Sequence, residues 1–507
     1  MVDSLHTERK ATGRGAMSAI MLALVAVVSA VSSINLATPS VARDLHATQT
    51  QITWIVDAYA LVFAALLLLA GAIGDRYGRR RALIAGLAVF AVAAAVATTV
   101  QSPGQLIAAQ AVLGVGAALV MPATLSTITS TFPPERRVHA VGTWAGVSGA
   151  SAMLGLLASG LLLQEWSWRS VFVFNLVLGL AALVAALAFV PESADPNAPR
   201  LDGVGALLSV AGLSLLVYSI IEAPTQGWSS AQTVGGLAAG LVVLAGFLGW
   251  ELTHHEPLLD PRLFRVRGFS AGTLTVTLQF FGFFGFVFLI VQYLQLVRGE
   301  NALVAALMVS PLAIVMMPAA RAVAPRAALR FGTRPVVVCG LLLLAAGLAV
   351  LSALDNSSSY LLLLCGLLLV GAGMGLAMTP ATNAITQTLP LAKQGVGSAM
   401  NDLARELGAA LGIAVLGSIM ASGYRDNLHL VGLPPAVVEQ TKSSLTVATH
   451  IGGPVALQAQ GAFVDGMQTA LLWAAGLLVL TAVAVAALLT NKATHNRQDA
   501  VEPETRS

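Results

Sequence analysis

Long apolar runs recur along almost the whole chain, and they constrain its fold more than any other feature. A run of about 18 or more apolar residues is long enough to cross a bilayer as a helix. Hydrophobic residues make up 57% of the 507 residues, and charged residues only 10%. A soluble chain of this length would need much more polar surface. The sequence therefore predicts an all-α polytopic membrane protein, because helices satisfy their own backbone hydrogen bonds inside lipid.

The apolar runs predict fourteen transmembrane helices. Their expected ranges are 17–38, 52–74, 82–101, 105–128, 138–163, 168–190, 203–222, 232–252, 269–296, 302–320, 335–354, 360–380, 395–421 and 463–490. Outside them lie a tail at 1–16, a tail at 491–507 and one long loop at 422–462. An even number of spans places both tails on the same side of the membrane.

The basic residues indicate which side that is. Most of the 27 lysines and arginines fall in the tails and in alternate connecting segments, such as 76–81, 262–267 and 321–334. Connecting segments rich in Lys and Arg stay in the cytoplasm. We therefore expect both termini to be cytoplasmic and the loop 422–462 to face outward.

Charge and motifs argue against several other classes of protein. The net charge of +3 gives no support for nucleic-acid binding, and the sequence contains no metal-ligand spacing, nucleophile elbow or phosphate-binding loop. We expect no enzyme activity, no cofactor and no metal. Cys339 and Cys365 lie in apolar runs and are expected to act as small hydrophobic residues. Without an ATP site, any transport would have to be driven by a gradient.

The two ends of the chain contain matching segments. The matching residues are Gly78 and Gly332, Pro122 and Pro380, Gly155 and Gly412, and Gly160 and Gly417. This repeat predicts a six-helix bundle at 17–190, a second at 269–490, and two inserted linker helices at 203–252. Transporters built from repeats place the substrate site between the halves and alternate access to it by rocking one half on the other.

Several segments resemble a known family. GAIGDRYGRRRAL at 71–83 fits the loop signature of the major facilitator superfamily. WIVDAYALV at 54–62, WSWRSVFVFN at 166–175 and EPLLDPRLFRVRGF at 256–269 resemble the fourteen-helix drug:proton antiporters, of the quaternary-ammonium and multidrug efflux type. The resemblance implies a major facilitator fold in the bacterial cytoplasmic (inner) membrane. It also implies lipophilic small molecules, protons and the lipid bilayer as partners, and we expect a monomer.

The chain departs from this family at three positions. The family often has Asp where this chain has Ala30, Arg where it has Gln110, and Pro where it has Leu156. In the family the Arg and the Pro are tied to proton coupling or antiport. The resemblance therefore supports the fold and leaves open whether coupling to protons is intact.

Asp57 is an acid within an apolar run. Burying a charge near the centre of a bilayer costs roughly 3 kcal/mol, so such residues persist where they face water, a partner or a substrate. We expect Asp57 about five residues below the outer end of its helix, roughly 8 Å deep and reachable from an outward-open cavity. The resemblance supports a substrate-cation or proton site there. The alternative is a packing hydrogen bond to a nearby Ser, Thr or Tyr.

A second charged cluster lies in the span 395–421. Asp402 and Glu406 are one helical turn apart, and Arg405 is three residues from Asp402. Glu406 is expected roughly 16 Å from the inner end, close to the midplane. We predict that this cluster couples protons or substrate, with Arg405 supplying the positive charge that Gln110 lacks. The alternative is a fixed salt bridge that joins helices.

Other residues have expected roles in gating, packing or the cavity. The gate-loop residues that the resemblance implies are Gly71, Asp75, Arg76, Gly78, Arg79 and Arg80. We expect Asp75 to meet a helix N-terminus or an arginine across the two halves, and Gly71 and Gly78 to permit close packing and a tight turn. A sliding helix seam is expected at Gly149, Gly155 and Gly160.

The substrate cavity is expected to be lined by Trp54, Asn35, Gln110, Phe280, Phe284 and Phe288. The phenylalanines form one stripe that suits planar or cationic amphiphiles. A packing or lipid-facing stripe is the alternative for these three. Glu222 and Glu251, near helix ends, are expected to snorkel to water.

These features predict a proton-coupled exporter of lipophilic, often cationic drugs that works by alternating access. One alternative is a narrower exporter or facilitator of a metabolite or lipid on the same fold. A second, from another class, is a membrane sensor or scaffold that no longer transports. The cost of inserting Asp57, Asp402 and Glu406 argues against the last.

Overall fold

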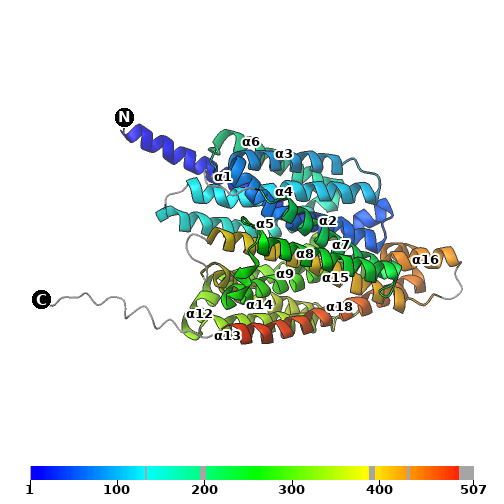
Figure 1. Ribbon diagram of the computed structural model, residues 1–507. Coiled ribbons are helices and arrows are strands. Elements are labelled where there is room, and N and C mark those ends of the chain that lie inside the picture. Colours follow the sequence, from blue (N-terminus) through cyan, green and yellow to red (C-terminus); the bar gives the residue numbers. More distant parts are fainter. Residues whose placement is uncertain (1, 132–133, 195–200, 388–393, 431–433, 490–507) are drawn as a thin grey trace.

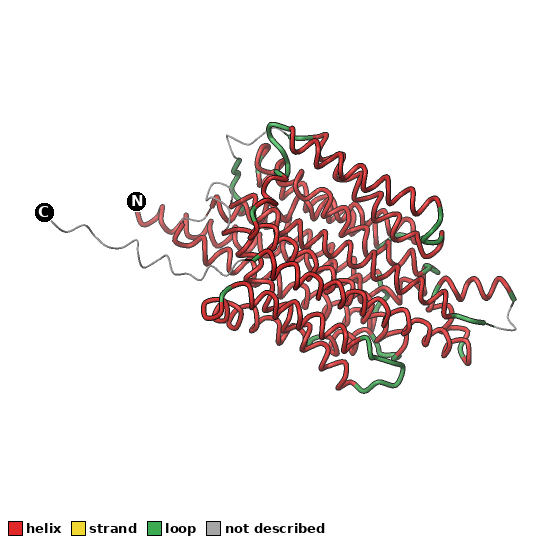
Figure 2. Tube along the Cα trace, turned by 60° about the horizontal axis from the view of Figure 1, so that its bottom comes forward, coloured by secondary structure: helices red, strands yellow, loops and turns green. Residues whose placement is uncertain are grey.

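The computed structural model describes residues 2–131, 134–194, 201–387, 394–430 and 434–489. Within these ranges the chain is helical and contains no strand, and the helices run alongside one another in a single bundle (Figures 1 and 2). The predicted all-α polytopic fold class is confirmed. The predicted tail at 491–507 lies outside the described residues.

We group the first eight long helices as the N-terminal half and the insert that the repeat predicts. The helices of the N-terminal half are α1 (Val2–Leu45), α2 (Gln49–Tyr77), α3 (Arg79–Ala97), α4 (Pro103–Thr131), α5 (Pro134–Glu165) and α6 (Arg169–Phe189). The insert consists of α7 (Gly203–Gln226) and α8 (Ala231–Thr253).

The rest of the chain forms the C-terminal half. Its elements are η1 (Pro261–Arg265), α9 (Arg267–Gln292), η2 (Tyr293–Val297), α10 (Ala302–Val309), α11 (Pro311–Pro318), η3 (Ala319–Val323), α12 (Ala324–Phe331), α13 (Thr333–Leu351), α14 (Tyr360–Gln387), α15 (Gln394–Asn427), α16 (Pro435–Ser443), α17 (Leu445–Ile451) and α18 (Gly453–Leu488). Elements η2 and η3 are π-helical turns.

Thirteen helical segments of the described chain are long and apolar enough to cross a membrane. One of them, Ala302–Phe331, combines α10, α11, η3 and α12. Prolines interrupt it at 311, 318 and 325, and each removes a backbone donor from the helical ladder. Helix α5, of 32 residues, covers the remaining predicted span.

Several helices are longer than the predicted spans. Helix α1 begins at Val2 rather than near residue 17, and α18 begins at Gly453 rather than near 463. The segment 422–462 is also largely helical, since it holds α16, α17 and the start of α18. Apolar runs mark only the part of a helix that lipid requires, so polar ends of the same helices were missed.

The two halves meet along a seam. We call the end where α1 begins and α18 ends the terminal end, and the opposite end the distal end (Figure 1). Across the seam, α2 packs against α15, and α5 packs against α10. At the distal end, the Gln49 amide of α2 donates to the Gln292 side chain of α9 at 3.1 Å, and the Gln295 amide donates to the Leu36 carbonyl of α1 at 2.9 Å. The distal end of the seam is therefore closed.

Candidate functional site

Asp57 lies inside α2 and is fully buried, with 0% of its surface exposed. Neither carboxyl oxygen has a hydrogen-bond partner among the described residues. Because α2 begins at Gln49, Asp57 lies about eight residues, or roughly 12 Å, along the helix. It is deeper than predicted and is closed off from the distal side. The alternative prediction of a packing hydrogen bond to Ser, Thr or Tyr is also wrong for this structure.

The neighbours of Asp57 on α2 show which helices cover it. Thr53 lies one turn before Asp57. A Cβ atom added to Gly417 of α15 would come within 3.3 Å of the Thr53 side chain. Leu61, one turn after it, is buried in an apolar cluster with Val217 and Ile221 of α7. Residues four apart share one face of a helix. Asp57 therefore lies at the junction of α2, α7 and α15, on the seam between the halves.

The acid cluster of α15 is also inside the bundle. An Arg405 guanidinium nitrogen lies 4.0 Å from an Asp402 carboxylate oxygen, and both side chains are largely buried. The same guanidinium lies over the Phe280 ring of α9, 4.9 Å from its centroid. Glu406 interacts electrostatically with both Arg405 and Asp402. Arg405 thus pairs with one carboxyl and lies over an aromatic ring, and the Glu406 carboxyl follows it in the chain, an arrangement that can hold a proton or a cationic ligand.

Close packing of α15 on α9 creates this arrangement. A Cβ atom on Gly408 would collide with the backbone carbonyl of Thr277, and one on Gly412 with that of Phe281. Small residues let membrane helices approach to this distance. Gly408 and Gly412 lie in the two turns of α15 that follow Arg405. Their close contact with α9 holds Arg405 against Phe280.

Glu406 and Asp57 belong to separate sites. Glu406 acts electrostatically on Tyr59 of α2, whose hydroxyl donates to the Val27 carbonyl of α1 at 2.9 Å. Tyr59 and Asp57 are two residues apart, so they point to opposite sides of α2. No charged group of the described chain interacts with Asp57. The structure therefore brings Asp402, Arg405 and Glu406 together and leaves Asp57 apart from them.

The predicted gate loop is anchored differently from the prediction. Arg79 pairs with Asp75 four residues earlier, with 2.8 Å between nitrogen and oxygen, so Asp75 meets an arginine of its own loop rather than one across the halves. The backbone nitrogen of Arg80 donates to Glu192 at 3.2 Å, and its guanidinium donates to the Leu187 carbonyl at 2.8 Å. The loop is thus fixed to the end of α6 within the same half. The i,i+4 spacing of Asp75 and Arg79 is a sequence signal that could have indicated this pair.

The gate-loop glycines Gly78 and Gly71 differ in the space that a side chain would have. Gly78 has a φ of 117°, and a Cβ atom there would come within 2.5 Å of Glu192, so only glycine fits this turn. A Cβ atom at Gly71 would meet Pro122 at 3.5 Å, an ordinary contact, so close packing does not require glycine there. The Arg76 guanidinium lies 5.9 Å from the centroid of the neighbouring Tyr77 ring.

The predicted cavity residues Trp54, Asn35 and Gln110 lie on different helices. Trp54 points to the insert, where its indole nitrogen donates to the half-buried Glu222 at 2.9 Å; its assignment to a central cavity stays a prediction. Asn35 is buried, and its Oδ1 has no partner among the described residues. Gln110 is 2% exposed. Glu251 is buried as well and accepts from the backbone nitrogen of Leu259 at 3.2 Å, so it does not snorkel.

The phenylalanine stripe is interior. Phe280 and Phe284 stack with their ring centroids 5.9 Å apart, and Phe288 is 1% exposed beside Gly417. The lipid-facing alternative is therefore wrong for Phe280 and Phe288. Next to this stripe, Gln279 is 0% exposed, and neither atom of its amide is partnered among the described residues. Sequence reasoning missed Gln279, although an amide inside an apolar span was visible.

Arg321 lies in a helical turn rather than in a loop. It was expected in the loop after the span 302–320, yet it lies in the π-helical turn η3, about ten residues before that helix ends at Phe331. Its side chain is exposed. The repeat offset of 254 residues pairs it with Leu67, in the middle of an apolar run. That pairing was the available signal for a basic residue within the span.

The predicted seam glycines separate into two contacts. A Cβ atom on Gly160 would come within 2.9 Å of Leu303 Cα on α10, which places Gly160 at the distal contact between the halves. A Cβ atom on Gly155 would come within 2.5 Å of the Ser29 carbonyl of α1, which is a contact inside the N-terminal half. The surroundings of Gly149 lie outside the described part of the structure.

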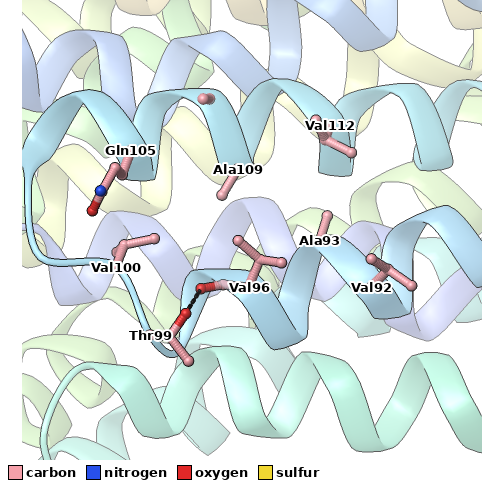
Figure 3. Close-up of a pocket in the computed structure, with 9 residues that line it drawn as sticks. Val92, Ala93, Val96, Thr99, Val100, Gln105, Ala109 and Val112 are labelled. Carbon is pink, nitrogen blue, oxygen red and sulfur yellow. Dashed lines mark hydrogen bonds between the residues drawn. The ribbon is translucent and has the colours of Figure 1, made fainter.

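A surface groove of about 420 Å³ lies between α3 and α4 (Figure 3). It is lined by Val92, Ala93, Val96, Thr99, Val100, Gln105, Ala108, Ala109 and Val112. Val92, Val96 and Val112 are exposed, and none of the predicted site residues reaches this groove. Among the described residues, no three His, Cys, Asp or Glu side chains come together as metal ligands.

Long apolar helices, a seam between two halves and buried acids on that seam define the class of protein: an integral-membrane transporter, not an enzyme. A family model described as Major Facilitator Superfamily matches residues 19–413. The chain belongs to the major facilitator superfamily.

Its relatives match over nearly their whole length. Multidrug efflux pump LfrA of Mycolicibacterium smegmatis is 36% identical and covers 93% of this chain and 94% of its own. The tetracenomycin C resistance and export protein of Streptomyces glaucescens is 33% identical, with 94% and 90% covered. Among solved structures, a bacterial homologue of the human lysosomal transporter Spinster, inward-facing and unoccupied, has a TM-score of 0.66 at 14% identity, with 93% and 96% covered. The structural match supports the fold alone.

Proposed function

We propose that this protein exports lipophilic, often cationic drugs across the bacterial inner membrane in exchange for protons. The observation that carries the proposal is Asp57, a fully buried carboxyl without a partner on the seam between two rocking halves. The named activities of the relatives, multidrug efflux and tetracenomycin C export, support drugs as the substrate class. Both termini lie in the cytoplasm in this proposal, as the basic segments indicate.

Proton binding at Asp57 follows from its burial. An ionised carboxylate without a hydrogen bond is very unfavourable in a dry site, so Asp57 is neutral while the distal end is closed. When α2 separates from α15, the carboxyl meets water at the outer side and can bind the proton that enters in exchange for the drug. Proton exchange at Asp57 is thereby linked to opening of the distal end, which is the outer end in this orientation.

The α15 cluster supplies the second part of the cycle. The Arg405 guanidinium lies 4.0 Å from Asp402, and Glu406 is one turn from Asp402, so a cationic substrate or a proton can replace the guanidinium at Asp402 or bind at Glu406. Phe280 and Phe284 offer stacked aromatic faces beside them. Cation–π attraction and ion pairing then favour lipophilic cations at this site. Two acid sites, one on each side of the seam, suit exchange of a proton for a cation.

The test is ethidium efflux from cells or inverted vesicles with and without an imposed proton gradient. We expect Asp57→Asn and Glu406→Gln to abolish gradient-driven efflux. Asp465→Asn, an exposed acid of α18, is the matched control and should leave efflux unchanged. Efflux at the normal rate without a gradient would instead support a facilitator, an outcome for which the neutral and buried Gln110 is a specific reason. Failure to move any compound would support a sensor or scaffold.

A further inference from the structure

The inserted helix α7 lies along the seam between the two halves. It packs against α2 of the N-terminal half and against α15 of the C-terminal half (Figure 1). A two-bundle transporter does not require inserted helices for its repeat architecture. The contacts of α7 indicate what this one does.

The contact of α7 with the C-terminal half is fixed by the backbone. Pro224 has no N–H, so it cannot donate to the carbonyl of Ile220 four residues earlier. The Ser418 hydroxyl of α15 donates to this carbonyl at 2.8 Å, within a buried environment. Just beyond α7, the Trp228 indole donates to the Ser422 hydroxyl of α15 at 2.9 Å. The C-terminal half therefore satisfies a carbonyl that α7 cannot satisfy itself.

The contact of α7 with the N-terminal half depends on side chains. The Trp54 indole nitrogen donates to Glu222 at 2.9 Å, and the Trp54 ring lies 5.9 Å from the ring of Tyr218. Leu61 enters the apolar cluster formed by Val217 and its neighbours. A side-chain hydrogen bond and apolar packing can be broken without leaving a backbone group unsatisfied.

These contacts surround Asp57. Trp54 lies three residues before it and Leu61 four residues after it, so all three share the face of α2 that α7 covers. Removing α7 from this face would expose Asp57, because α15 covers it from one side only. The insert is thus part of the enclosure that keeps the carboxyl dry.

We propose that α7 moves with the C-terminal half and that its contact with α2 is the part of the distal gate that opens. Trp54 and Glu222 are then positioning residues, which act through Asp57 by holding α7 over it. This inference rests on the proposed function. The motion of α7 can be measured without knowing any substrate.

The first test measures distances between spin labels in lipid nanodiscs. Labels are introduced through Arg43→Cys, Ser229→Cys and Asn427→Cys, all at exposed distal positions, after Cys339 and Cys365 are replaced by serine. The pair at 229 and 427 reports α7 against the C-terminal half and should give one distance. The pair at 43 and 229 reports α7 against the N-terminal half and should give a second, longer distance from the open state.

Variants at the contact between α7 and α2 should change the proportion of molecules that show the longer distance. Loss of one hydrogen bond of about 1 kcal/mol corresponds to about a fivefold shift, so Trp54→Phe should raise the longer 43–229 population about fivefold. Glu222→Gln keeps an acceptor oxygen for Trp54 and should leave the populations unchanged, whereas Glu222→Leu should resemble Trp54→Phe. Trp473→Phe, an exposed tryptophan of α18, is the control.

A second measurement reads Asp57 directly. In Asp57→Cys, a membrane-impermeant maleimide added at the distal side should react about fivefold more in the Trp54→Phe background, and no faster in the Trp473→Phe background. The proposal is wrong if the distance between labels at 229 and 427 changes while the distance between labels at 43 and 229 stays fixed. It is also wrong if Trp54→Phe leaves the maleimide labelling of Asp57→Cys unchanged. If the labelled protein shows the expected distances but does not transport ethidium, that result contradicts the proposed function and leaves the proposed motion of α7 standing.

Discussion

At the scale of single residues, three acids lie inside the helices, and the fold leaves one of them, Asp57, without a partner among the described residues. Asp57 is fully buried, Asp402 lies 4.0 Å from the Arg405 guanidinium, and Glu406 follows one turn after Asp402. A fold selected for stability alone would replace such groups, since apolar residues of similar size are often more stable when buried. Their presence supports the transport role that we propose for them.

Removing the Asp57 carboxyl tests this conflict between stability and function. Asp57→Leu should raise the melting temperature of the purified protein by a few degrees, because an unsatisfied buried polar group costs about 1–3 kcal/mol. Gradient-driven efflux should be lost in the same variant. Thermal unfolding in detergent and vesicle efflux are the two measurements. A variant that is strongly destabilised would show that Asp57 has a structural partner instead.

Arg405 combines two interactions that can be separated. Arg405→Lys keeps the charge near Asp402 but loses the planar contact with Phe280, so we expect efflux to fall about tenfold. Arg405→Ala should abolish proton-driven transport, since it leaves two buried carboxyls without a cation. Arg425→Ala, which breaks a half-exposed pair with Glu439, is the control and should have little effect. Normal pH dependence of transport in Arg405→Ala would remove Arg405 from the coupling site.

At the scale of helices and loops, some contacts follow from local spacing and others do not. The number of long helices, the Gly78 turn and the Asp402 to Glu406 spacing could be read from the sequence. The partner of Trp54 could not, because the face of α2 that it occupies is covered by α7, about 170 residues later, and only tertiary packing determines this. The Glu192 anchor of the gate loop is missed for the same reason.

The two glycines of the gate loop give a prediction with an internal control. Gly78→Ala forces a side chain into a positive φ and against Glu192, so it should destabilise the turn by about 1–2 kcal/mol and reduce transport. Gly71→Ala has room for its Cβ atom and should behave as the original protein. Thermal stability and efflux rate provide the comparison. If Gly78→Ala and Gly71→Ala have the same thermal stability and efflux rate, the turn at residue 78 does not require glycine.

At the scale of the whole molecule, two halves meet at the distal end through α2 with α15 and α5 with α10. The insert α7 closes the same seam from the side. The repeat in the sequence predicts two pseudo-equivalent bundles, but it contains no information on the insert, which has no counterpart in the repeat. This is why the sequence places the acids within helices but does not predict the enclosure of Asp57 by α7.

The most direct test of the central claim follows proton movement during drug exchange. Purified protein is placed in liposomes that contain a pH-sensitive dye, and an ethidium gradient is imposed across the membrane. We predict that the original protein moves protons against the ethidium flux and that Asp57→Asn moves ethidium, if at all, without protons. Proton movement at an undiminished rate in Asp57→Asn would contradict the account.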